Sequence, residues 1–247
     1  MKFLYALLIA PLLFAADLPS ADKLLQLSLE RSGGAQAFAK AKNAVMTGTV
    51  EIAGHNITGP VSLYQQGAKS YTVIDLPGIG KVEEGFDGEI AWEMNALQGA
   101  RIKEGEEKAE TERASKISLL SSWRDYYKEA KTLGSEDVEG KPAWKVEMTP
   151  KEGRPETFYF DKESALLVRT TATVATPLGE IPAEASMGDY RMVDGIQTPF
   201  TLTEKAMSQV MVMRFDKVQY NAPIPPDRFD LPPLVKALLD KRKQPPQ

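Results

Sequence analysis

The chain has no cysteine and a single histidine, and both shortages narrow the chemistry open to it. Without cysteine it forms no disulfide, offers no thiolate nucleophile or zinc–thiolate site, and has no thiol to accept the lipid of a classical lipoprotein. His55 stands in a turn-like Gly54-His55-Asn56 segment, without a neighbour that would orient the ring for acid–base or metal chemistry. The acid-rich run at residues 104–112 fits a helix, which would scatter its carboxylates around the axis. We therefore expect no cofactor and no metal site.

A basic surface and a membrane-spanning segment are missing as well. Lysine and arginine number 30 against 34 aspartates and glutamates, for a formal net charge of −4. Nucleic-acid binding requires a concentrated positive surface, so we expect no nucleic-acid partner. The apolar run at residues 3–14 is shorter than the roughly 20 residues that cross a bilayer.

Residues 1–16 have the pattern of a secretory signal. Lys2 precedes the apolar run, and the small residues Ala15-Ala16 follow it. We predict that this segment is removed on export, leaving a chain that does not span the membrane. The remainder is expected to form a single domain over residues 17–233, followed by a short helix and a frayed tail over residues 234–247.

Catalytic motifs are also absent. The sequence contains no Gly-x-Ser-x-Gly elbow, no dinucleotide-binding glycine loop and no phosphate loop. Acidic residues are abundant, but a sequence does not show the separation of two carboxylates across a cleft. We therefore expect a binding protein and not an enzyme, with a carboxylate-based hydrolase as an alternative.

The chain does contain many short β-rich runs separated by turn residues. Those between residues 45 and 95 predict five strands in a meander of antiparallel neighbours. Further strands are expected between residues 129 and 220. Among them, Asp194-Gly195 joins two β-rich runs and predicts a tight hairpin, because glycine tolerates the positive φ of a primed turn.

Helical patterns stand before, between and after these strands. Ser20 can cap a helix whose apolar residues recur at helical spacing until Gly33-Gly34. A second, short helix is predicted over residues 35–42, a further helix over residues 103–128, and a short amphipathic helix after Pro233. The apolar stripe of the helix at residues 103–128 comprises Ile117, Leu120, Trp123 and Tyr127.

Large apolar side chains on the strands form the candidate site. They alternate with polar residues, so we predict that they share one face of a curved sheet. If helices cover that face tightly, these residues are core; if the sheet curls incompletely, they line an apolar cavity, which suits the flexible thioether of methionine. The candidate ligand-binding residues are Met46, Leu63, Tyr71, Val73, Trp92, Met94, Trp144, Met148, Phe158, Met211 and Met213.

Several turn and packing signatures resemble those of a known family. An opening helix that ends at Gly33-Gly34 is followed by a strand start at residues 43–48. The other signatures lie at residues 85–93, 160–161, 166–169, 188–191, 193–196, 199–200 and 229–232. In this arrangement the chain resembles the periplasmic lipoprotein-carrier superfamily, the LolA/LolB-like outer-membrane lipoprotein-sorting proteins.

The resemblance implies a mainly β (α+β) fold, a curved and incompletely closed antiparallel β-barrel of about 11 strands wrapped around helices. It also implies a monomeric carrier that shields the acyl chains of a lipid or an acylated protein in an apolar cavity. Such a carrier lies in the periplasm, secreted across the inner membrane of a Gram-negative-type bacterium. In the dedicated carriers an arginine on an early strand takes part in ligand handling, and the strand at residues 45–53 has none. The alternative is an envelope structural or stress-sensing protein that uses this fold as a scaffold for an envelope protein partner.

Overall fold

The computed structural model describes residues 18–176 and 179–243, so the signal predicted at residues 1–16 lies outside the described residues. The helices are α1 (Ala21–Arg31), α2 (Gly34–Lys40), α3 (Gly105–Ala114), α4 (Trp123–Tyr126) and α5 (Pro233–Lys243), with a 3₁₀ turn, η1, at Leu120–Ser122. The strands are β1 (Asn43–Ile52), β2 (Ile57–Gln66), β3 (Lys69–Leu76), β4 (Gly80–Phe86), β5 (Ala91–Asn95), β6 (Gly99–Lys103), β7 (Tyr127–Val138), β8 (Lys141–Pro150), β9 (Glu156–Asp161), β10 (Leu167–Thr176), β11 (Gly179–Val193), β12 (Ile196–Ala206) and β13 (Gln209–Tyr220).

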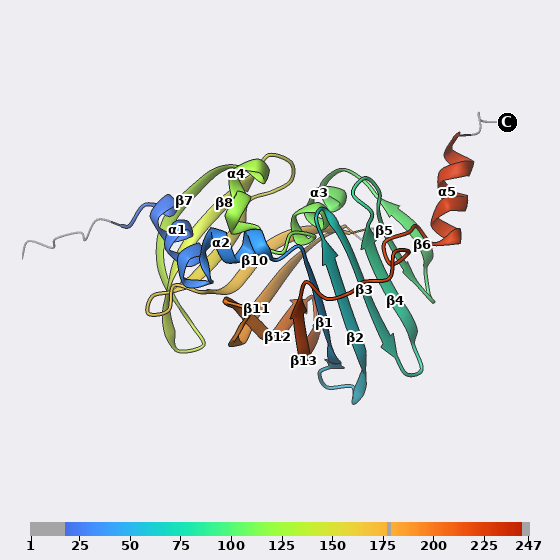
Figure 1. The fold of residues 1–247 in the computed structure, drawn as a ribbon, viewed down its shortest axis with the longest axis horizontal. Helices are drawn as coiled ribbons and strands as arrows, with labels where there is room; N and C mark the ends of the chain where they lie inside the picture. Colours follow the sequence, from blue (N-terminus) through green and yellow to red (C-terminus); the bar gives the residue numbers. More distant parts are fainter. Residues whose placement is uncertain (1–17, 177–178, 244–247) are drawn as a thin grey trace, which may run out of the picture.

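The strands of the described residues form one antiparallel sheet of 13 strands in the order β6-β5-β4-β3-β2-β1-β13-β12-β11-β10-β9-β8-β7. Strands β6 and β7 are the two edges, so the sheet does not close on itself. Figure 1 shows β1 to β6 on one side of the molecule and β7 to β10 on the other, with α1 and α2 against the second half. The predicted incompletely closed antiparallel barrel is confirmed, with 13 strands where about 11 were expected.

The hairpin chemistry follows the sequence closely. Strands β1 to β5 pair in chain order, as the predicted meander of five strands requires, and β6 extends this order. Asp194 and Gly195, with φ of 48° and 84°, connect Val193 to its cross-strand partner Ile196. This is the primed turn predicted at this point, in which both central residues need positive φ.

Strand β6 was not predicted from the sequence pattern. Its 5 residues are too few to show a clear alternation of apolar and polar positions. Two of them, Arg101 and Lys103, are charged and lie beside the acid-rich run. The strand forms because β5, which pairs with β4 on one side, offers its other edge, where the pairing runs from Ala91↔Lys103 to Asn95↔Gly99.

The single helix predicted over residues 103–128 is wrong, because the chain leaves the helix after Ala114. Ser115 closes α3 by donating its hydroxyl to the Glu112 carbonyl at 2.7 Å. Gln65 of β2 then donates its side-chain amide to the Ala114 carbonyl at 2.9 Å. That carbonyl would accept a helical hydrogen bond if α3 continued, so a contact from a distant strand ends the helix.

Two apolar clusters pack between the helices and the face of the sheet that they cover, which we call the inner face. The first joins Ala21, Leu24 and Leu25 of α1 to the inner face of β7 to β10. The second joins Phe38 of α2 to the inner face of β1 to β3, β12 and β13. The N-terminus of α1 is capped by Ser20, whose hydroxyl accepts the Lys23 N–H at 3.4 Å, as predicted.

The opposite, outer face is covered in part by the C-terminal segment. Residues 221–232 cross the front of β1 to β4 in Figure 1 and lead to α5, which packs against the edge strand β6. Phe229 is buried in this segment and Val235 is fully buried in α5. Among the helices of the described residues, none combines the length and apolar character needed to cross a bilayer.

Candidate functional site

A cavity of about 500 Å³ lies between the inner face of the sheet and the helices. Its floor comes from β9 to β12, and its walls come from α2, the end of α3 and the segment that joins α3 to η1. The apolar part of the lining includes Phe38, Met46, Ile117, Phe158, Leu167 and Met187.

Small side chains on β10 leave this space unfilled. Thr170, Ala172 and Val174 all line the cavity, as expected for alternate residues of a strand that point to one face. Across the ladder, Ala172 pairs with Ala183 of β11, so small residues meet on neighbouring strands. Leucine or phenylalanine at these positions would fill the hollow and turn it into core.

One part of the cavity wall carries an ion pair. Arg113, at the end of α3, donates Nη2 to Glu156 Oε1 of β9 at 2.6 Å, and its side chain is 6% exposed. Its Nη1 donates to the Glu152 carbonyl at 3.1 Å. The Tyr127 hydroxyl donates to the other Glu156 oxygen at 3.0 Å. Burial, and then the neighbouring Glu156 carboxylate, raise the pKa of the Tyr127 hydroxyl, so this phenol remains a donor.

Glu110 lines the cavity one turn before Arg113, and no hydrogen bond or ion pair engages its side chain within the described residues. Its pKa is raised to about 7, mainly because burial penalises the charged form. The Arg113 cation opposes that rise, and the Glu156 carboxylate adds to it. Glu110 therefore changes charge near neutral pH.

Two tyrosines at the cavity wall are held by internal hydrogen bonds. The Tyr190 hydroxyl donates to the Leu167 carbonyl at 2.5 Å, and burial raises its pKa. The Tyr220 hydroxyl lies 2.8 Å from Thr198 Oγ1. Since these hydroxyls already have partners, they contribute shape to the lining more than free hydrogen-bonding capacity.

The predicted site residues do not share one face, and the strand register gives the reason. Met46 pairs with Leu63, and Leu63 pairs with Thr72 of β3, so the neighbours of Thr72 point to the outer face. The residues on the inner face are Met46, Leu63, Trp144, Met148, Phe158, Met211 and Met213. Those on the outer face are Tyr71, Val73, Trp92 and Met94.

The prediction of a common face is therefore wrong for Tyr71, Val73, Trp92 and Met94. On the outer face the Tyr71 and Trp92 rings lie 6.1 Å apart, and the Arg228 guanidinium of the C-terminal segment lies 5.5 Å from the Tyr71 ring. The sequence does not tell the two faces of these strands apart, because large apolar side chains occur on both. Helices cover those on the inner face, and the C-terminal segment covers the aromatic residues on the outer face.

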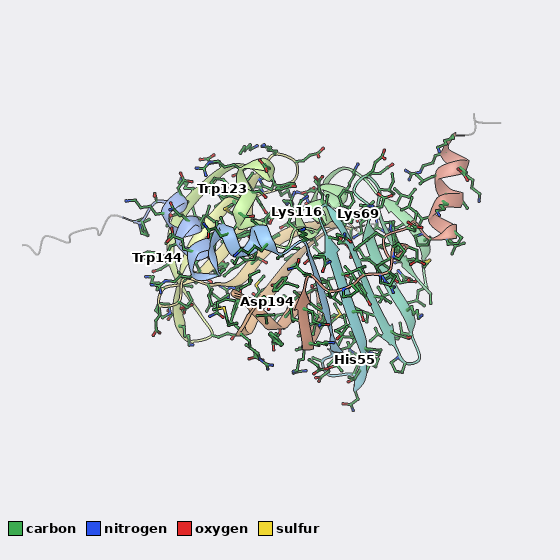
Figure 2. All side chains as sticks on the ribbon, viewed as in Figure 1. His55, Lys69, Lys116, Trp123, Trp144 and Asp194 are labelled. Atoms are coloured by element: carbon green, nitrogen blue, oxygen red, sulfur yellow. The ribbon has the colours of Figure 1, made fainter. Side chains whose placement is uncertain are left out.

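Within the inner-face set, Met46 and Phe158 line the cavity. Met148 and Met213 are buried in the two apolar clusters, and Trp144 packs at the edge of one of them. Figure 2 shows Trp144 near α1 and His55 at the far tip of the β1–β2 hairpin. Ligand contact by these residues stays a prediction.

Sequence reasoning missed most of the cavity wall. Glu110, Arg113, Ala114 and Ile117 recur at spacings of three and four, which marks one side of a helix and its continuation. On β10, the alternation of residues 170, 172 and 174 was also visible. Neither pattern stood out, because small and charged residues are typical of exposed surfaces.

No family model and no curated protein matches the sequence. Solved structures do match. An outer membrane lipoprotein-sorting protein domain from Vibrio parahaemolyticus aligns at TM-score 0.58 and 13% identity, covering 89% of this chain and 99% of that one. A LolA superfamily protein from Nitrosomonas europaea aligns at TM-score 0.56 and 12% identity, covering 87% and 99%.

The protein has a LolA-like fold. A DUF1329 family protein from Desulfovibrio piger shares it, at TM-score 0.57 and 14% identity, over 85% of this chain and 97% of that one. At such identities the likeness establishes the architecture alone. In this LolA-like chain the hollow between sheet and helices is therefore assessed from its own residues.

Proposed function

We propose that this protein is a periplasmic carrier that holds the acyl chain of a lipid or an acylated protein in the cavity on the inner face. The observation that supports this most directly is the mainly apolar hollow of about 500 Å³ between the sheet and the helices. Its volume falls within the range of roughly 300–1,000 Å³ that is usual for small-molecule sites. The secretory pattern of residues 1–16 supports the periplasmic location.

An acyl chain suits such a lining energetically. Each methylene removed from water contributes about 0.8 kcal/mol, so a chain of a dozen carbons supplies up to ~10 kcal/mol before the entropy of binding is subtracted. Tyr190, Tyr220 and the Arg113–Glu156 pair already have hydrogen-bond partners within the protein. Along most of its length a ligand therefore meets few free hydrogen-bonding groups. Affinity then depends mainly on chain length, as a carrier of varied acylated ligands requires.

The first test is whether the protein carries lipid. Native mass spectrometry of the purified mature chain should show a lipid adduct, or uptake of an added monoacylglycerol with a fluorophore at the end of its chain. An empty protein that takes up no such probe would contradict the proposal and favour the scaffold alternative.

A matched pair of variants places the ligand. Ala172→Trp puts an indole into the cavity, whereas Thr173→Trp puts the same group on the exposed outer side of the same strand. We expect Ala172→Trp to weaken probe binding at least tenfold and Thr173→Trp to leave it unchanged. If Ala172→Trp does not fold, Thr170→Leu occupies the cavity less severely from the same strand. Equal binding by the cavity variant and the control would place the lipid elsewhere.

A further inference from the structure

The polar side chains of the cavity wall differ in whether they have hydrogen-bond partners within the protein. Both oxygens of Glu156 accept hydrogen bonds, one from Arg113 and one from Tyr127. Both terminal nitrogens of Arg113 donate, to Glu156 and to the Glu152 carbonyl. Among the ionisable side chains in the described lining, Glu110 alone has no such partner. A bound ligand therefore meets a free carboxyl group and a cation that is already neutralised.

Several other charges on α3 and on the strands packed against it are committed to partners. On its own helix, Glu106 is paired with Arg154 at 3.4 Å. From the strands that pack against α3, Lys103 lies 2.7 Å from Glu84. Lys103 also lies 3.7 Å from Glu93, and Arg101 pairs with Glu93 at 2.6 Å and with Glu107 at 2.7 Å. None of these cations is free to receive an anionic ligand at the cavity wall.

We propose that the cavity selects acyl chains whose polar end is a hydroxyl or an amine, and discriminates against chains that end in a carboxylate or a phosphate, because Glu110 is the free group that meets that end. This inference rests on the proposed function and names the ligand class for the same cavity. A hydroxyl or an ammonium donates to the Glu110 carboxylate, whereas an anionic head brings a like charge into a poorly hydrated space.

The pH dependence follows from the same group. With its pKa raised to about 7, Glu110 is largely protonated at pH 6 and ionised at pH 8.5. Over this interval an alkyl ammonium gains a counter-charge and binds more tightly, whereas a carboxylate meets growing repulsion. A hydroxyl can donate to the ionised form or accept from the protonated form, so its binding changes little.

The test compares ligands with the same twelve-carbon chain and different heads. Monododecanoylglycerol, dodecylamine, dodecanoate and dodecyl phosphate are each used, below their micelle concentrations, to displace the fluorescent monoacylglycerol at pH 6 and pH 8.5. We expect dodecanoate and dodecyl phosphate to bind at least tenfold more weakly than the glyceride at pH 8.5. Dodecylamine should bind about tenfold more tightly at pH 8.5 than at pH 6.

Glu110→Gln keeps the size of the side chain and removes its charge. It should abolish the pH dependence of dodecylamine binding and narrow the gap between dodecanoate and the glyceride. Glu112→Gln makes the same change on the same helix outside the cavity lining, and it should retain the wild-type pattern. Circular dichroism checks that both variants are folded.

The outcomes separate this inference from the proposed function. If the glyceride and dodecanoate bind the wild-type protein equally at pH 8.5, the head-group inference is overturned and the carrier function stands. The same holds if Glu110→Gln binds all four ligands as the wild type does. If none of the ligands displaces the probe and native mass spectrometry shows no adduct, the proposed function is overturned together with the inference.

Discussion

Removing one partner of the ion pair in the cavity wall should lower the free energy of unfolding by more than removing both partners does. Arg113 and Glu156 have side chains that are 6% and 17% exposed, with their charged atoms 2.6 Å apart. At an effective dielectric constant of about 20, their attraction is roughly 6 kcal/mol, most of which offsets the cost of removing both charges from water. Removing one partner leaves the other charge in the wall with that cost uncompensated.

Arg113→Met keeps most of the apolar stem of the arginine and removes its charge. Among the described residues, the Glu156 carboxylate then keeps the Tyr127 hydroxyl as its hydrogen-bond donor. We expect the free energy of unfolding to fall by about 3 kcal/mol, at the lower end of the range for breaking a buried pair, because Glu156 keeps some contact with water.

The double variant Arg113→Met/Glu156→Gln removes both charges and should recover part of the loss. We expect it to be about 1.5 kcal/mol less stable than the wild type, which gives a coupling energy of at least 1.5 kcal/mol in the cycle with Glu156→Gln. Urea unfolding followed by circular dichroism measures all four proteins, with the slope checked for two-state behaviour. Additive effects, within about 0.5 kcal/mol, would refute the argument that the two charges form one buried unit.

Three further changes test separate parts of the structure. Gly48→Ala should destabilise the protein by more than about 2 kcal/mol, because a Cβ there would lie 2.0 Å from the Arg214 carbonyl oxygen. Its control is Gly188→Ala, whose Cβ meets no atom within 4 Å and which should be near neutral. The urea midpoints of the two variants are compared. Glu110→Gln should stabilise the protein above pH 7 and not at pH 4: the folded-state pKa of about 7 lies above the ordinary value, so the wild type loses stability as pH rises between the two values. After discounting for partial exposure, we expect a gain of about 1 kcal/mol at pH 8. Trp92→Ala should lower the unfolding free energy by about 3 kcal/mol and leave probe affinity unchanged, because Trp92 is buried on the outer face.

Each of these has a plain counter-result. Equal stability of the two glycine variants would show that the β1–β13 contact relaxes at no cost. A Glu110→Gln gain that is the same at pH 4 and pH 8 would show that charge burial is not its cause. Probe binding that weakens in a folded Trp92→Ala protein would place ligand contacts on the outer face.

Much of the architecture could be read from local patterns. Asp194-Gly195 specifies its hairpin because both positions need positive φ, and the short turns between strands specify neighbours in chain order. Ser20 marks the start of α1 through a contact three residues away. Such features depend on residues close in the chain, so their physical basis is present in the sequence.

The site depended on contacts that are distant in the chain. The end of α3 is set by Gln65, which lies 49 residues before the carbonyl that it binds, and this break helps to shape the cavity wall. The face to which Tyr71 and Trp92 point follows from strand register, since a shift of one residue exchanges the two faces. The pairing of Arg113 with Glu156, and the isolation of Glu110 beside them, arise where α3 meets β9 across 43 residues of sequence. Local residue patterns therefore specified most of the strands and their turns, whereas the hollow and its unpaired carboxyl exist only because the folded sheet brings these distant segments together.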